Sequence, residues 1–126
     1  MLTARNVQFY DLVKEMFMDE LLLREVCELV GVTRRAVQGY ENSGLVAATG
    51  KNKMGHLLYD KKAIDTIKEI KQYQNCGFSL DEIKRLRFMS ETEKRKFLEV
   101  KVQFLKAEQS RIIDSISFLK AYIEKL

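Results

Sequence analysis

The chain has 126 residues, the length of one domain with room for a short additional element. Apolar residues make up 46% of it and charged residues 32%, proline and tryptophan are absent, and the formal net charge is +4. This composition excludes a disordered chain and favours helices. No stretch reaches the roughly 20 consecutive apolar residues of a membrane span, and no signal-peptide pattern opens the chain, so we expect a cytoplasmic protein with no membrane partner.

The charges are unevenly distributed. Residues 1–20 contain two basic and four acidic side chains, whereas residues 93–126 contain eight basic and five acidic ones. We therefore expect the first segment to avoid a phosphate backbone, which the rest of the chain is able to follow.

The first predicted element is an amphipathic helix within residues 4–18, with apolar positions at helical spacing: Phe9, Leu12, Val13, Met16 and Phe17. We treat residues 1–20 as a helical extension. Its simplest role is to pack on the surface of the domain or the dimer, and a regulatory role is the alternative.

Two short helices are predicted next, joined by a tight turn at Gly31, Val32 and Thr33. Glycine is suited to end the first helix and threonine to cap the second. The first has the apolar stripe Leu22, Leu23, Val26, Leu29 and Val30, and the second has the stripe Ala36, Val37 and Tyr40, ending at Asn42-Ser43-Gly44.

Residues 45–59 have the pattern of a small hairpin with a basic tip. Its predicted strands are Leu45-Val46 and Leu57-Leu58-Tyr59, and the loop between them carries Lys51 and Lys53. Asp60 is expected to cap a helix that runs to about Gln74 and stops before Gly77, with a buried face formed by Ile64, Ile67, Ile70 and Tyr73. Two capping boxes, Ser79 with Glu82 and Ser90 with Glu93, mark the next two helix starts.

The last helix carries the clearest periodicity, a heptad repeat with apolar positions alternately four and three residues apart. The predicted dimerisation residues are Leu98, Val102, Leu105, Ile112, Ile116, Leu119 and Ile123, and the polar Gln109 lies within the same seam. The preceding domain is too small to cover such a helix, so a partner chain is a better explanation than a helix folded back on its own domain.

No catalytic constellation is present. His56 is the only histidine, and no glycine-rich phosphate loop or metal-binding motif occurs. Cys27 and Cys76 lie far apart within apolar helical patterns, where we interpret them as small hydrophobic residues rather than redox or metal sites. We therefore expect neither an enzyme, nor a metal site, nor a cofactor.

The paired helices instead form a candidate helix-turn-helix, whose second helix would enter the major groove of DNA. That helix begins with Thr33, Arg34 and Arg35, and Gln38 follows one turn later. Arginine can bind guanine bidentately or hold phosphate, and glutamine can read adenine.

Three segments resemble the MerR family of regulators. Leu23–Leu45, with its ending Tyr40-Glu41-x-x-Gly44-Leu45, resembles the family's N-terminal signature, and Gly55–Asp60 resembles its wing. Cys76–Lys84 is similar to the start of its second helix pair. With the final heptads, the resemblance covers about residues 21–126.

The resemblance implies a mainly α fold: a winged helix-turn-helix with a small β-hairpin wing, followed by a long antiparallel coiled-coil helix. It implies a homodimer on double-stranded DNA, bound to a pseudo-palindromic promoter whose spacer it distorts so that RNA polymerase engages. Carried over to this chain, it places Arg35 in the recognition helix and Tyr40 against phosphate, with Lys51, Lys53 and His56 on the wing. The expected domains are 1–20, the helical extension; 21–90, the DNA-binding domain; and 91–126, the dimerisation helix.

Some residues depart from the family's pattern. Leu57 occupies the place of a wing arginine, Gln38 that of a common basic residue and Gly39 that of a common aromatic one. The alternative hypothesis is therefore a dimeric protein-interaction module that keeps the fold with weak or non-specific DNA binding.

Overall fold

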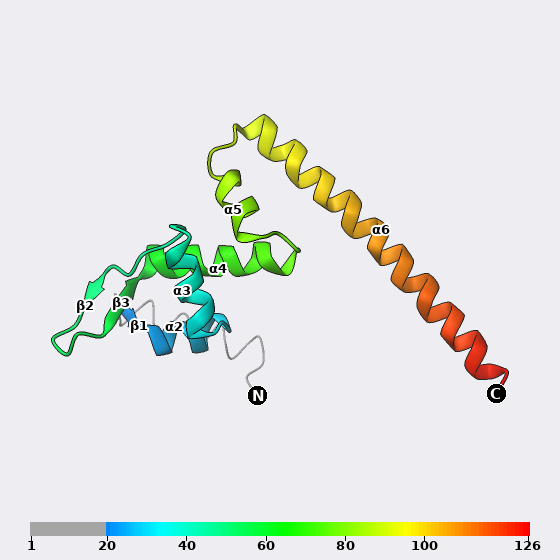
Figure 1. Cartoon of the computed structure of the whole chain (residues 1–126), viewed down its shortest axis with the longest axis horizontal. Helices are drawn as coiled ribbons and strands as arrows, with labels where there is room; N and C mark the ends of the chain where they lie inside the picture. The colour runs from blue at the N-terminus through cyan, green and yellow to red at the C-terminus, as the bar shows by residue number, and fades with distance from the viewer. Residues whose placement is uncertain (1–19) are drawn as a thin grey trace. The chain divides into compact units, whose positions relative to one another are not determined.

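The computed structural model describes residues 20–126, and Figure 1 shows the order of its elements. They are β1 (Glu20–Leu22), α2 (Leu23–Val30), α3 (Arg34–Asn42), β2 (Gly50–Lys51), β3 (Leu57–Asp60), α4 (Lys61–Asn75), α5 (Leu80–Leu86) and α6 (Glu91–Glu124). The predicted helix within residues 4–18 lies outside the described residues. The chain divides into two compact units, of which the structure describes residues 20–84 in the first and 85–126 in the second.

The first unit combines three packed helices with a small sheet (Figure 1). Helices α2, α3 and α4 contact one another, and the antiparallel sheet has the strand order β1-β3-β2. Helices and sheet share one apolar core, because the largest fully buried side chains come from both: Leu21, Val26, Val37, Tyr40, Tyr59, Ile67 and Ile70. The predicted winged helix-turn-helix fold is confirmed.

The turn between α2 and α3 forms as predicted. Gly31 takes a left-handed backbone conformation with φ of 79°, which glycine adopts without the strain of a Cβ atom. The backbone N–H groups of Gly31 and Val32 both donate to the carbonyl of Cys27, at 2.9 and 3.2 Å. Thr33 then caps α3, its Oγ1 accepting from the N–H of Ala36 at 3.0 Å.

The prediction of a strand at Leu45-Val46 is wrong. The N–H of Leu45 donates to the carbonyl of Tyr40 at 3.0 Å, closing α3 around Gly44, whose φ is 75°. Leu45 is buried by this turn, so its apolar character reflects a helix end rather than a strand. The strand that pairs with β3 begins at Gly50, with Gly50 opposite Leu58 and Lys51 opposite Leu57.

The sheet contains a third strand that the sequence analysis missed. β1 pairs antiparallel with β3, with Leu21 opposite Tyr59 and Leu22 opposite Leu58. Leu22 therefore lies in a strand and not on the helical stripe predicted for it, and α2 starts one residue later. The run Leu21-Leu22-Leu23 does not distinguish a strand from a helix by its periodicity, because both can bury consecutive leucines.

Helix α4 begins and ends close to the predicted positions, and α5 begins where its capping box predicts. α4 ends with Gly77 at φ of 94° and with the N–H of Phe78 donating to the carbonyl of Tyr73 at 3.1 Å. The two rings meet edge to face with their centroids 5.8 Å apart, which leaves Tyr73 half-buried rather than buried as predicted. The capping box before α5 is confirmed: Ser79 N–H donates to Glu82 Oε1 at 3.0 Å, and Glu82 N–H to Ser79 Oγ at 3.2 Å.

The two cysteines differ in their surroundings. Cys27 is half-buried, and this burial raises the pKa of its thiol. Cys76 is exposed at the C-cap of α4, so it does not pack as the small hydrophobic residue that its helical pattern predicted. The helical periodicity extends into the cap residue, where it no longer implies burial.

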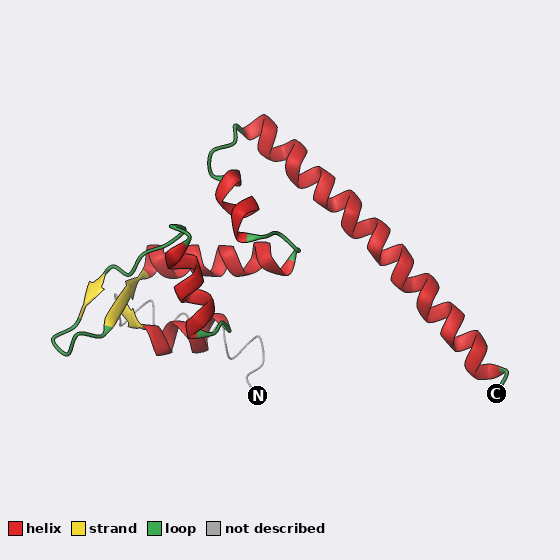
Figure 2. Ribbon diagram, viewed as in Figure 1, coloured by secondary structure: helices red, strands yellow, loops and turns green. Residues whose placement is uncertain are grey.

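The second unit is dominated by α6, a helix of 34 residues. Figure 2 shows it as one continuous helical ribbon. At 1.5 Å per residue it is about 51 Å long. Ser90 caps it as predicted, accepting from the N–H of Glu93 at 3.2 Å. No residue of α6 is buried within the chain. No helix in residues 20–126 is long and apolar enough to cross a membrane.

Candidate nucleic-acid interface

The predicted recognition helix has an apolar face and a polar one. Val37 and Tyr40 are 0% and 1% exposed and anchor α3 in the core. Arg34, Arg35 and Gln38 are all exposed, so the side chains predicted to contact DNA lie on the side away from the core. α3 is thus held by one face and offers the other to a ligand.

Thr33 is exposed at the start of α3, but its oxygen already accepts the N–H of Ala36. The hydroxyl hydrogen is still able to donate to a phosphate oxygen. The cap therefore limits Thr33 to the role of a donor in any DNA contact.

The wing tip is organised by Asn52. Its Oδ1 accepts from the N–H groups of Met54 and His56, at 2.9 and 3.0 Å. Its own N–H donates to the carbonyl of His56 at 2.9 Å, and Gly55 completes the turn with φ of 83°. Lys53 and His56 are exposed on this short loop, and Lys51 is exposed at the end of β2 that leads into it.

A groove connects the wing to the helix-turn-helix. Arg34 from α3 and His56 from the wing line it together, although 22 residues separate them in the sequence. Its remaining lining residues are Leu22, Leu23, Arg24, Asn52, Met54 and Leu57. Arg35, Gln38, Lys51 and Lys53 lie outside the groove lining, on the exposed surfaces of the same unit.

Arg24 and Asn52 were not among the predicted site residues. The position of Asn52, three residues before a glycine in a hairpin loop, is typical of an asparagine that bonds to its own turn. Arg24 carries no comparable signal, because it reaches the groove only through the packing of α2 beside the wing.

In this part of the chain the basic side chains are more exposed than the acidic ones. Residues 21–60 contain five basic and four acidic side chains, and all five basic ones are exposed. Three of the four carboxylates are half-buried in structural hydrogen bonds: Glu25 accepts from Leu22 N–H, Glu41 from Ala48 N–H, and Asp60 from Ala63 N–H. Glu28 is the one exposed carboxylate of this segment.

Tyr40 does not fit the role carried over from the family. Its ring is 1% exposed, and its hydroxyl donates to Gln74 Oε1 of α4 at 2.6 Å. Burial raises the pKa of this hydroxyl. Tyr40 therefore connects α3 to α4 in the core, and its burial argues against contact with a phosphate.

Glu41 joins the recognition helix to the wing. Its Oε1 accepts from the hydroxyl of Tyr59 at 3.1 Å and from the N–H of Ala48 at 3.2 Å. Burial, together with this bond to a carboxylate, raises the pKa of Tyr59 well above its usual range. The Tyr40-Glu41-x-x-Gly44-Leu45 motif thus fixes the position of the wing relative to α3.

The predicted dimerisation residues lie on α6. Leu98 is half-buried, and Val102, Leu105, Ile112, Ile116, Leu119 and Ile123 are exposed large apolar side chains. Exposed apolar rows of this length are typical of interaction surfaces.

The chain was compared with known protein families and curated proteins. Residues 22–87 match the family described as "MerR HTH family regulatory protein". The chain is 38% identical over 61 residues to the nodulation protein NolA of Bradyrhizobium elkanii, covering 48% of this chain and 28% of that protein. It is 30% identical over 80 residues to a probable heavy metal-dependent transcriptional regulator of Haemophilus influenzae, covering 64% and 62%. The chain thus spans about a quarter to two fifths of the length of the nodulation proteins that it matches.

Solved structures with the same fold are also regulators. A MerR-family transcriptional regulator from Bacillus cereus superposes with a TM-score of 0.68 at 28% identity, covering 84% of this chain and 81% of the other. HiNmlR, a MerR-family regulator crystallised with promoter DNA, superposes with a TM-score of 0.64 at 21% identity, covering 84% and 91%, and supports the fold alone. These relatives are named as regulators and not as enzymes, in agreement with the sequence-based expectation. The chain belongs to the MerR HTH family of regulatory proteins.

Proposed function

We propose that the chain is a dimeric, sequence-specific DNA-binding transcription regulator. One observation carries the proposal: the basic and polar side chains of α3 and of the wing are exposed together in residues 21–60, where three of the four carboxylates accept structural hydrogen bonds. A major groove admits a helix, and a flanking loop is able to reach the adjacent backbone.

In this proposal, Arg35 and Gln38 read base edges, and Arg34 and Thr33 hold phosphate at the start of α3. Lys51, Lys53 and His56 contact the backbone from the wing. The proposal leaves out Tyr40 because its hydroxyl is engaged with Gln74. It adds Arg24, whose exposed side chain lines the same groove as Arg34 and His56.

The dimer is proposed to form through the α6 seam, by antiparallel pairing. Burying an aliphatic side chain of the seam is favourable by about 1.5–3 kcal/mol relative to leaving it in water. Pairing with a second α6 is therefore more stable than an isolated helix. Two symmetric recognition helices would require a pseudo-palindromic site.

The family resemblance extends the proposal to promoter distortion. A dimer that holds its two recognition helices at a fixed separation is able to bend or untwist the spacer, so that RNA polymerase engages. HiNmlR, which shares this fold, is itself bound to promoter DNA, and we propose the same class of ligand for this chain.

The test compares two exposed cations with different expected roles. Replacing a base-reading arginine, Arg35→Ala, should weaken binding to operator DNA by about 1–3 kcal/mol and leave binding to scrambled DNA little changed. Replacing a phosphate contact, Lys51→Ala, should weaken both equally and reduce the salt slope by about 2, because both protomers of the dimer lose the contact. Fluorescence anisotropy measures both, and equal losses on the two DNAs for Arg35→Ala would contradict base reading.

Two residues favour a second candidate, a dimeric protein-interaction module with weak DNA binding. Leu57 lies in the groove where the family has an arginine, and Met54 on the wing is 80% exposed. Apolar side chains at these positions add nothing to phosphate binding. Under this alternative, Lys51→Ala and Arg35→Ala leave the salt dependence unchanged.

A further inference from the structure

The tip of the wing carries a large apolar side chain that the fold leaves in water. Met54 is 80% exposed. Its backbone is nevertheless held in place, because its N–H donates to Asn52 Oδ1 at 2.9 Å and Gly55 follows in a left-handed conformation with φ of 83°. The loop is therefore already ordered, so binding a partner at Met54 costs little further ordering of the backbone.

The charges around Met54 indicate what kind of partner it meets. No acidic residue occurs between Glu41 and Asp60, whereas Lys51 and Lys53 are exposed close to Met54 in the same stretch. A cationic loop with an apolar tip complements a polyanion that also presents apolar surface. DNA is such a partner, because its grooves expose base edges between two rows of phosphates.

The groove beside the wing places Met54 relative to the recognition helix. Met54 of the wing and Arg34 at the start of α3 line this groove together. With α3 in the major groove and Arg34 on a flanking phosphate, as proposed above, a backbone strand of the DNA passes between the two elements. Because one backbone strand separates the major groove from the minor groove, the wing tip then reaches the minor groove.

We propose that Met54 lies in the minor groove and selects A·T base pairs there. The inference rests on the proposed DNA-binding function and adds a specificity-determining residue to it. Methionine is one of the apolar side chains that minor-groove proteins insert against bases. The guanine N2 amino group projects into the minor groove at G·C pairs, where Met54 would crowd and desolvate it, and A·T pairs lack that group.

The test uses inosine, which pairs with cytosine and lacks the N2 amino group of guanine. An I·C pair therefore keeps the major-groove edge of G·C but has no amino group in the minor groove. Hydroxyl-radical footprinting of the full chain on its upstream DNA first locates the base pairs under the wing, and these are then set to A·T, I·C or G·C in turn. Fluorescence anisotropy should show that the wild type binds the A·T and I·C sites about tenfold more tightly than the G·C site.

Matched variants separate Met54 from other causes of this preference. Met54→Ala should bind the I·C and G·C sites equally and keep the salt slope of the wild type, because it removes no phosphate contact. Met54→Leu should retain the preference. Phe88→Ala should also retain it, since Phe88 is an equally exposed apolar residue, at 84%, that lies between α5 and α6. Lys53→Ala should reduce the salt slope by about 2 for the dimer and retain the preference.

Other outcomes would overturn the proposal. Equal wild-type affinity for the I·C and G·C sites would show that no contact in the minor groove distinguishes them. A preference that survives in Met54→Ala would assign it to another side chain or to the shape of the DNA. A reduced salt slope for Met54→Ala would show that Met54 only positions the lysines. Failure of the proposed function is a separate result: the wild type would then not prefer upstream DNA to scrambled DNA, and the role of Met54 would fall with it.

Discussion

At the level of single residues, two glycines in and beside α3 have opposite roles. A Cβ atom at Gly39 or at Gly44 would meet nothing within 4 Å, so backbone conformation alone separates them. Gly39 is inside the helix, where glycine costs conformational entropy, whereas Gly44 has a left-handed φ of 75°. No other part of the described chain approaches Gly39 closely enough to require a glycine there.

This difference predicts opposite effects of alanine. Gly39→Ala should raise the free energy of unfolding by about 0.5–1 kcal/mol. Gly44→Ala should lower it by about 1–2 kcal/mol, because the left-handed conformation is strained for a residue with a Cβ atom. Urea denaturation of the two variants beside the wild type measures both, and a destabilising Gly39→Ala would indicate a contact made only in the assembled protein.

Tyr59 predicts a loss of stability at alkaline pH. Its pKa is raised in the folded chain, so between the ordinary tyrosine value and the folded one the unfolded chain binds fewer protons and stability falls with rising pH. The contribution is complete below about pH 10 and is lost as the pH rises through the folded pKa.

Tyr59→Phe removes that titration and also the bond to Glu41. At pH 7 it should lower the free energy of unfolding by about 1.5–3 kcal/mol, as expected for a hydrogen bond to a carboxylate. Between pH 9 and 11 it should lose less stability than the wild type does. Urea denaturation at several pH values measures this, and parallel curves for the two proteins would contradict the assignment.

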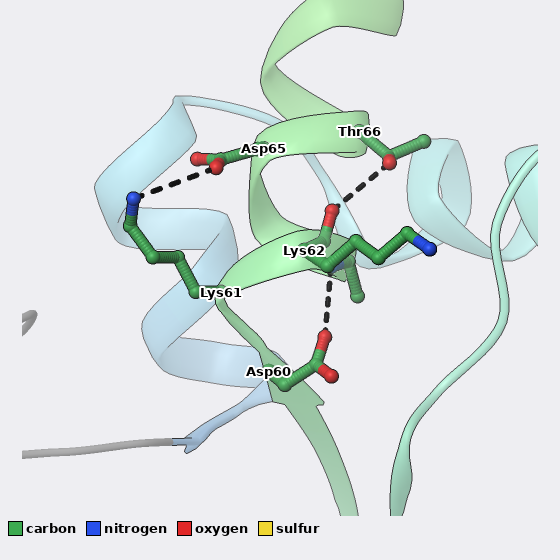
Figure 3. Close-up of polar contacts among 6 residues, drawn as sticks. Asp60, Lys61, Lys62, Asp65 and Thr66 are labelled. Atoms are coloured by element: carbon green, nitrogen blue, oxygen red, sulfur yellow. Dashed lines mark hydrogen bonds and ion pairs between the residues drawn. The ribbon is translucent and has the colours of Figure 1, made fainter.

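At the level of elements, the helix caps determine where the helices of the first unit begin. Figure 3 shows the start of α4, where Asp60 Oδ1 accepts from the N–H of Ala63 at 2.9 Å. In the same turn the ammonium of Lys61 lies 3.9 Å from the carboxylate of Asp65, with both side chains more than half exposed. A cap satisfies a backbone donor that otherwise has no partner, whereas an exposed ion pair is screened by water.

The two aspartates should therefore differ in their effect on stability. Asp60→Ala should lower the free energy of unfolding by about 1 kcal/mol, and up to about 2 kcal/mol. Asp65→Ala, the matched control, should lower it by less than about 0.5 kcal/mol. Thermal denaturation of both variants tests this, and equal losses would show that the cap is not the dominant interaction at this turn.

The caps also explain which elements the sequence predicted well. Thr33, Asp60, Ser79 and Ser90 marked helix starts correctly, because a capping bond is local and uses residues three apart. β1 and the true start of β2 depend on pairing with β3 across long sequence separations, and no local pattern encodes that pairing. Leu45 was misassigned because an apolar residue after glycine fits a strand start and a helix end equally well.

The candidate nucleic-acid interface was likewise predictable only where a local sequence pattern determines the structure. The exposed face of α3 followed from periodicity and from the resemblance, since burial of Val37 and Tyr40 determines which side chains are exposed. Tertiary packing alone brings Arg34 and His56 together in one groove and adds Arg24 to its lining. The burial of Tyr40 likewise follows from its contact with Gln74, 34 residues further along the chain.

At the level of the whole molecule, the seam of α6 should couple oligomeric state to DNA binding. Ile112 and Ile113 are adjacent, identical and similarly exposed, at 44% and 55%, but only Ile112 belongs to the predicted seam. Ile112→Lys should convert dimers to monomers and greatly weaken operator binding, because a monomer contacts one half-site. Ile113→Lys should largely retain both properties. Sedimentation and anisotropy on the same samples test this, and equal behaviour of the two variants would contradict the seam.

The most direct test of the central claim is the salt dependence of binding to DNA from upstream of the protein's own gene, with scrambled DNA as competitor. Each neutralised phosphate contributes about −0.9 to the slope of log K against log salt, so phosphate contacts from Arg24, Arg34, Lys51 and Lys53 of each protomer predict a slope near −7 for the dimer. We expect this slope together with a marked preference for the upstream DNA. Weak binding with a shallow slope and no preference between the two DNAs would contradict a sequence-specific regulator and favour the protein-interaction module.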